Sequence, residues 1–158
     1  MNDDLLQLLK VQEVDGELRS LEEAKSQYPE EISQRKSEID QAERNLKELT
    51  DRIEKLEKEQ RKLEGQLELA KEDLKKHEER FAEVTTNKEY DALQVEIEAC
   101  KGRMSETETQ ILEIIESSDS TREQIELEKR DLDEIREAQQ SIIDELQGKL
   151  DSIQGEVD

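Results

Sequence analysis

The stretch NLKELTDRIEKLEKEQRKLEGQLELAKEDL, residues 45–74, decides the fold. Apolar side chains recur in it at alternating intervals of three and four residues, beginning with Leu46, Leu49 and Ile53, and most other positions are charged or polar. This spacing follows one narrow stripe along an α-helix, and its persistence is typical of a coiled coil. The sequence therefore predicts a helix that buries this stripe, here called the seam, against another helix.

The same alternation continues in both directions, and only three of the seam positions reached are polar. The positions are Ile32, Arg35, Ile39, Ala42, Leu46, Leu49, Ile53, Leu56, Gln60, Leu63, Leu67, Ala70, Leu74, His77, Phe81 and Val84. A second seam runs from Tyr90 to Leu146 and is more polar between Ser118 and Glu128. Two seams of similar length, joined by a short segment, predict two long helices that pack on each other.

The two seams match when the chain is folded back on itself. We pair residues whose numbers sum to 174, which places Asn87 at the centre. Small residues then face large ones, as in Ala70–Met104, and polar residues face polar ones, as in Arg35–Gln139. The predicted fold class is all-α, a long antiparallel coiled-coil helical hairpin. We predict one hairpin over residues 1–158, with a first arm at about 3–84, a tip at 85–89 and a second arm at about 90–158.

The tip sequence TTNKE, residues 85–89, contains turn and capping chemistry. Asn87 tolerates the left-handed conformation used in tight helix–helix turns, and Thr86 with Glu89 fits a capping box that starts the return helix. Asn87, Lys88, Glu89 and Tyr90 also combine mixed charge with an aromatic ring at the end of an arm. They are therefore either turn chemistry, with Tyr90 closing the seam, or a site that docks a partner.

Pro29 is the one proline of the chain. The seam keeps its phase backwards through it as far as Val11, which favours a kink in a continuous helix over a loop. In the second arm, consecutive four-residue steps lead from Ile142 to Leu146 and Leu150. Such a stutter unwinds a supercoil locally, so a bend near Pro29 is expected.

Composition excludes several classes of protein. The chain is 44% charged and 31% hydrophobic, with no Trp, which is too little apolar volume for an ordinary globular core. Its net charge of −21 disfavours contact with nucleic acid or an anionic membrane. Residues 104–158 hold 17 acidic and 5 basic groups, which form either a solvated helix face or a site for a basic partner.

The sequence contains no apolar run that would span a bilayer and no signal-peptide core after Met1. Its lone cysteine excludes an internal disulfide framework, and we expect a cytoplasmic protein. Cys100 lies on the seam opposite Leu74, where a small buried residue fits, and His77 lies on the seam facing Ile97. With no catalytic motif, cleft or set of metal ligands, we expect no enzyme activity and no cofactor in this chain.

An apolar group near the N-terminus has no partner in this pairing. Its members are Leu5, Leu6, Leu8, Leu9 and Val11. A stripe of this size is normally covered. Either it forms a homodimer, or it contacts a segment of the native chain that continues beyond Asp158, and we expect such a continuation.

The segment TTNKEYDALQVEIEACKGRM, residues 85–104, resembles the bacterial coiled-coil/C4-type zinc-ribbon proteins. The similarity is carried by Asn87, Lys88, Glu89, Tyr90, Ala92 and Leu93. It implies that the whole chain is the hairpin portion and that a zinc ribbon follows it. No C-x-x-C pair occurs in this sequence, so the zinc ligands of the family correspond to none of its residues.

The resemblance implies an adaptor for protein partners, such as a sigma-54 factor or a type III export or flagellar component. A second hypothesis is a prefoldin-like holdase or a structural spacer that acts through oligomerisation of its apolar ends. A third is a regulator that binds nucleic acid through the ribbon, because the acidic hairpin itself is unsuited to such contact.

Overall fold

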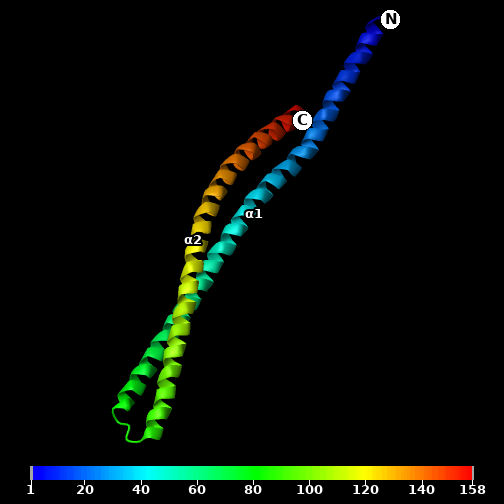
Figure 1. Cartoon of the computed structure of the whole chain (residues 1–158). Helices are drawn as coiled ribbons and strands as arrows, with labels where there is room; N and C mark the ends of the chain where they lie inside the picture. Colours follow the sequence, from blue (N-terminus) through cyan, green and yellow to red (C-terminus); the bar gives the residue numbers. More distant parts are fainter. Residues whose placement is uncertain (1, 158) are drawn as a thin grey trace. The chain divides into compact units, whose positions relative to one another are not determined.

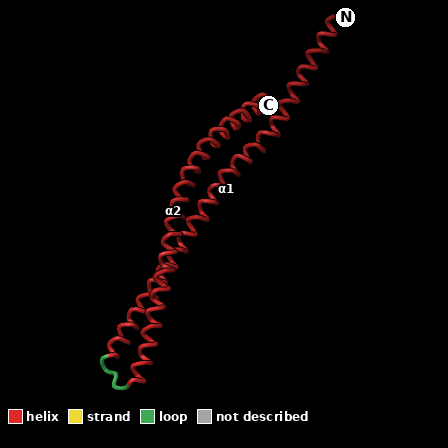
Figure 2. The backbone as a smooth tube through the Cα atoms, in the orientation of Figure 1, coloured by secondary structure: helices red, strands yellow, loops and turns green. Residues whose placement is uncertain are grey.

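The structure, a computed structural model, describes residues 2–157 and contains two helices. Helix α1 runs over Asn2–Phe81 and helix α2 over Asn87–Val157, joined by residues 82–86 (Figures 1 and 2). The described residues contain no strand. The prediction of an all-α, antiparallel coiled-coil hairpin is confirmed.

The predicted seams are the buried faces of the two helices. Every predicted seam position from Ile32 to Val84 is buried or half-buried. All other described residues in this range are exposed except Glu57, which is half-buried. In α2, every predicted position from Leu93 to Leu146 is likewise buried or half-buried. Burial thus follows the alternation of three and four residues, because each helix has one face toward the other and the rest toward solvent.

The chain divides into two compact units, the first formed by residues 2–46 and 128–157 and the second by residues 47–127. In the second unit the α1 side of the core includes Leu63 and Ala70. On the α2 side, Leu93, Ile97 and Ile111 are buried. The core of this unit is therefore a single narrow layer of side chains between two helices.

The core of the first unit is a cluster of aliphatic side chains. Ile32, Ile143 and Leu146 are buried, and Tyr28, Ile39 and Ile142 pack against them. Ile143 lies beside the predicted seam position Ile142, so the apolar face of α2 is wider here than the seam predicts. The wider face coincides with the predicted stutter, where two neighbouring positions share the turn toward α1.

Polar contacts in the first unit fix the pairing of the helices. Arg35 Nη1 donates to Gln139 Oε1 at 3.2 Å, which joins the pair that the sequence predicts. Gln139 Nε2 also donates to Glu38 Oε2 at 2.6 Å, and Arg136 Nη2 donates to Glu43 Oε1 at 2.9 Å. The register of the first unit is therefore the one in which paired residue numbers sum to 174.

Pro29 lies inside α1, and the helix continues on both sides of it. A proline lacks the N–H that would bond to the carbonyl of Lys25, and its ring crowds that carbonyl. Figure 1 shows a gentle bend of α1 where its colour passes from blue to cyan, the stretch that includes Pro29. The helix thus bends where the sequence predicts a kink, and no loop interrupts it.

The connection differs in detail from the predicted tip. Residues 82–86 lie outside the helices, whereas Asn87 and the next two residues of the predicted tip already belong to the first turn of α2. Asn87 does not adopt the left-handed conformation that asparagine tolerates, because no described residue has a positive φ. The physical reason is the cap at Thr86, which starts α2 at the following residue.

Candidate interaction surfaces

The start of α2 is fixed by hydrogen bonds around Thr86. The Glu89 N–H donates to Thr86 Oγ1 at 3.2 Å, as in a capping box, and the Tyr90 N–H donates to the Thr86 carbonyl at 3.1 Å. The Glu89 carboxylate accepts from the N–H of Thr85 at 3.5 Å, one residue before the position that the motif predicts. The bond to Thr86 Oγ1 satisfies a donor that a helix N-terminus would otherwise leave free, and the bond to the Thr86 carbonyl is the first main-chain hydrogen bond of α2.

An aromatic contact joins the two helix ends at the tip. The rings of Phe81 and Tyr90 meet edge to face, with centroids 4.8 Å apart and planes at 69°. Tyr90 remains 45% exposed, so one side of its ring packs while another faces solvent. Seam pairing alone places Tyr90 opposite Val84, but the ring reaches Phe81, one turn further from the connection. The contact holds Tyr90 in a defined orientation.

The predicted partner-docking residues Asn87, Lys88, Glu89 and Tyr90 are all exposed and lie on consecutive positions of the first turn of α2. They present an amide, an ammonium, a carboxylate and a phenol within one turn. The capping bonds and the ring contact position this turn without using the side chains of Asn87 or Lys88. The four predicted residues therefore follow one another around the first turn of α2, and all four are exposed to solvent.

The apolar residues near the N-terminus are exposed in the described part of the chain. The exposed fractions are 61% for Leu5, 56% for Leu6, 59% for Leu8, 51% for Leu9 and 56% for Val11. Figure 1 shows that α1 begins well beyond the C-terminal end of α2. No described residue of α2 covers this part of α1.

The two seam residues considered as chemical candidates are packed between the helices. Cys100 is fully buried, and Arg103 Nη2 donates to its sulfur at 3.0 Å. His77 Nδ1 lies 3.2 Å from Glu96 Oε2, outside the geometry of a hydrogen bond, and the His77 side chain is 20% exposed. Among the residues that the structure describes, no group of three or more His, Cys, Asp or Glu side chains could hold a metal ion.

The hollows on the described surface are open grooves beside the helices. One groove in the first unit has a volume of about 970 Å³ and lies along Gly16, Ser20 and Ala24, next to Ile153. Another, in the second unit, measures about 420 Å³ and lies between Leu69 on α1 and Arg103 on α2. Neither encloses a space that would exclude water from a reacting group. In the part of the chain that the structure describes, no helix is long and apolar enough to cross a membrane.

Comparison with protein families assigns this geometry to a known class. A family model described as the CT398-like coiled coil hairpin domain matches residues 11–158. The chain belongs to this family. The match includes the tip and both seams, and it begins after the four leucines of the N-terminal group. No curated protein and no solved structure matched the chain.

Coiled-coil hairpins of this kind are typically non-catalytic, and a CT398-like hairpin fits a structural or interaction role. The sequence located the exposed turn and the exposed leucines. It missed the contact between Phe81 and Tyr90, because stepping along the seam pairs residues at the same level and ignores how far a ring extends along the helix. A search that also considered aromatic residues on α1 one turn away from Val84, the residue paired with Tyr90, would have found this contact.

Proposed function

We propose that the CT398-like hairpin is a non-enzymatic adaptor that docks protein partners through Asn87, Lys88, Glu89 and Tyr90. The observation that carries this proposal is the exposure of all four residues on a turn that is fixed by the cap at Thr86 and by the contact of Tyr90 with Phe81. A fixed turn loses little conformational entropy when a partner binds, which favours affinity. Tyrosine is also enriched at protein interfaces because it combines an apolar ring with a hydroxyl.

The proposed partners are proteins with basic surfaces. The chain has a net charge of −21, which attracts basic surfaces and repels phosphates. The resemblance of residues 85–104 to coiled-coil/C4-type zinc-ribbon proteins supports a sigma-54 factor or a type III export or flagellar component as the partner. In this proposal the hairpin acts in the cytoplasm, and a zinc ribbon follows it in the whole protein.

The proposal is tested by the binding of a purified sigma-54 factor to the hairpin in a titration followed by fluorescence anisotropy. The double variant Lys88→Glu with Tyr90→Ala is expected to weaken binding at least about a hundredfold, because it removes an aromatic anchor and replaces the ammonium that pairs, in this proposal, with an acidic group within the partner's otherwise basic surface. Circular dichroism checks that the helices persist in the variant.

Two matched controls separate docking from folding. Tyr90→Phe retains the ring contact with Phe81 and is expected to retain most of the binding. Lys101→Glu makes the same charge change at an exposed lysine about three turns beyond Tyr90 and is expected to change binding little. Equal binding by the double variant and the native chain would refute the tip as the docking surface.

A further inference from the structure

The first turns of α1 carry an apolar stripe that does not belong to the hairpin seam. Leu5, Leu8 and Leu9 follow the i, i+3, i+4 spacing of one helix face, and they are 61%, 59% and 51% exposed. All three precede Val11, where the match to the family begins. We call these three residues the N-terminal stripe.

The N-terminal stripe faces away from the seam. Stepping back from Val11 by four and then three residues reaches Gln7 and Asp4, so the seam is polar at this end of α1. At about 100° per residue, the centre of the stripe lies roughly a third of a turn around the helix from the seam. A helix that packed along the seam would therefore meet Val11 and leave the N-terminal stripe uncovered.

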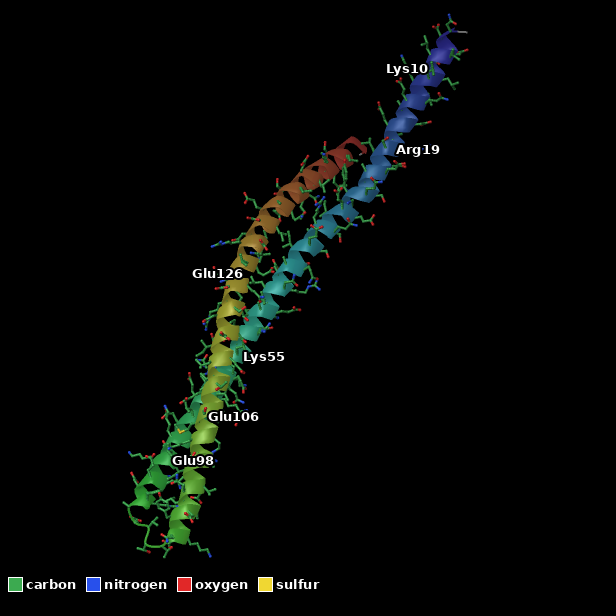
Figure 3. All side chains as sticks on the ribbon, in the orientation of Figure 1. Lys10, Arg19, Lys55, Glu98, Glu106 and Glu126 are labelled. Atoms are coloured by element: carbon green, nitrogen blue, oxygen red, sulfur yellow. The ribbon has the colours of Figure 1, made fainter. Side chains whose placement is uncertain are left out.

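The charges around the N-terminal stripe are mostly negative. By the same periodicity, Asp4 and Asp15 border one side of the stripe and Glu13 borders the other. Residues 2–17 contain five acidic groups and one basic group, Lys10. Lys10, labelled in Figure 3, is placed by this periodicity on the far side of the helix from the stripe. The apolar surface thus has acidic borders on both sides.

These charges distinguish between the possible occupants of the stripe. Two copies that met through it would bring like-charged borders together, with net repulsion between the segments. An anionic lipid surface would be repelled in the same way. A helix with apolar residues along one face and Lys or Arg beside them would instead gain both apolar burial and opposite charge.

We propose that the N-terminal stripe is a docking site for an amphipathic helix of a partner protein, with a leucine-rich face bordered by basic residues. The surface lies on different residues from the tip, so this inference goes beyond the adaptor function proposed above and can fail independently of it. Leu5 and Leu9 supply the apolar contact. Asp4, Glu13 and Asp15 attract the basic residues that border the apolar face of the partner helix.

The test uses two synthetic helical peptides and the full chain. Both peptides carry leucine at i, i+3, i+4 and i+7 positions; one has Lys at the bordering positions and the other has Glu. The lysine peptide is expected to bind the native chain, and binding should weaken at least about tenfold in the double variant Leu5→Ser with Leu9→Ser. Because these side chains are exposed, circular dichroism should show unchanged helicity.

A matched control distinguishes the N-terminal stripe from general attraction to an acidic chain. The double variant Leu112→Ser with Leu127→Ser removes leucines that are 65% and 60% exposed on α2, and it should bind the lysine peptide like the native chain. The double variant Asp15→Lys with Glu13→Lys should bind the lysine peptide more weakly, and the glutamate peptide more tightly, than the native chain does. The glutamate peptide should bind the native chain much more weakly than the lysine peptide does.

Four results would overturn the inference. The first is equal binding of the lysine peptide to the Leu5 and Leu9 variant and to the native chain. The second is equal binding of both peptides to the native chain. The third is self-association of the chain, measured by sedimentation velocity, that the Leu5 and Leu9 changes abolish, because the occupant would then be a second copy. The fourth is binding to zwitterionic phosphatidylcholine vesicles that the same changes abolish, because the occupant would then be lipid.

Discussion

Ser118 offers a direct test of the energetics of the polar part of the seam. Its side chain is 1% exposed, and its hydroxyl has no hydrogen-bond partner among the described residues. A buried hydroxyl without a partner costs about 1–3 kcal/mol, and alanine is a better helix former than serine by about 0.5 kcal/mol. Ser118→Ala should therefore raise the free energy of unfolding by more than the difference in helix propensity alone.

The assay is urea unfolding of the chain followed by circular dichroism at 222 nm. Ser120→Ala is the matched control, because Ser120 is exposed on the same helix and gains only the propensity difference of about 0.5 kcal/mol. Thr121 provides a second comparison, since its equally buried hydroxyl donates to the Ser117 carbonyl at 2.7 Å and is satisfied. A gain for Ser118→Ala no larger than the gain for Ser120→Ala would refute the reasoning.

Three further predictions use the same unfolding assay. Leu132→Ala, at a side chain that is 4% exposed, should destabilise the chain by about 2–5 kcal/mol through a cavity, whereas Leu127→Ala, at 60% exposure, should change stability by no more than about 0.5 kcal/mol. Equal effects of the two changes would contradict the assignment of the seam. Thr86→Ala removes the acceptor of the Glu89 N–H and should cost about 0.5–2 kcal/mol, and no loss would show that the cap is unimportant. Pro29→Ala restores a helical donor and should stabilise the chain by up to about 3 kcal/mol, while destabilisation would indicate that the bend is needed for packing.

Most of the fold was predictable because the residues that make the contacts of a coiled coil recur at regular intervals along the sequence. The alternation from Ile32 to Val84 specifies the buried face, and the matching seam of α2 specifies the register that the bond between Arg35 and Gln139 confirms. Ile143 was missed because the stutter after Ile142 turns two neighbouring side chains inward, which a rule that assigns one residue per step cannot represent.

The candidate surfaces were predictable in position but not in geometry. The capping motif at Thr86 indicated where α2 starts, yet Asn87 was expected in the turn because asparagine suits a left-handed residue as well as an early helical one. The contact of Tyr90 with Phe81 depends on the reach of two rings across the connection. The exposed leucines are visible in the sequence, but their direction relative to the seam becomes meaningful only once the seam is known to be buried.

The tip and the N-terminal stripe are both located by the antiparallel register, so cross-linking of that register is the decisive test of the hairpin. Arg35→Cys with Gln139→Cys, in a Cys100→Ala chain, places two thiols where the native side chains touch at 3.2 Å. A short bis-maleimide reagent should link them within one chain, and mass spectrometry should identify a cross-linked monomer. The pair Arg35→Cys with Gln147→Cys, two turns out of register, should react much more slowly. Predominant links between chains, or faster reaction of the shifted pair, would contradict the hairpin.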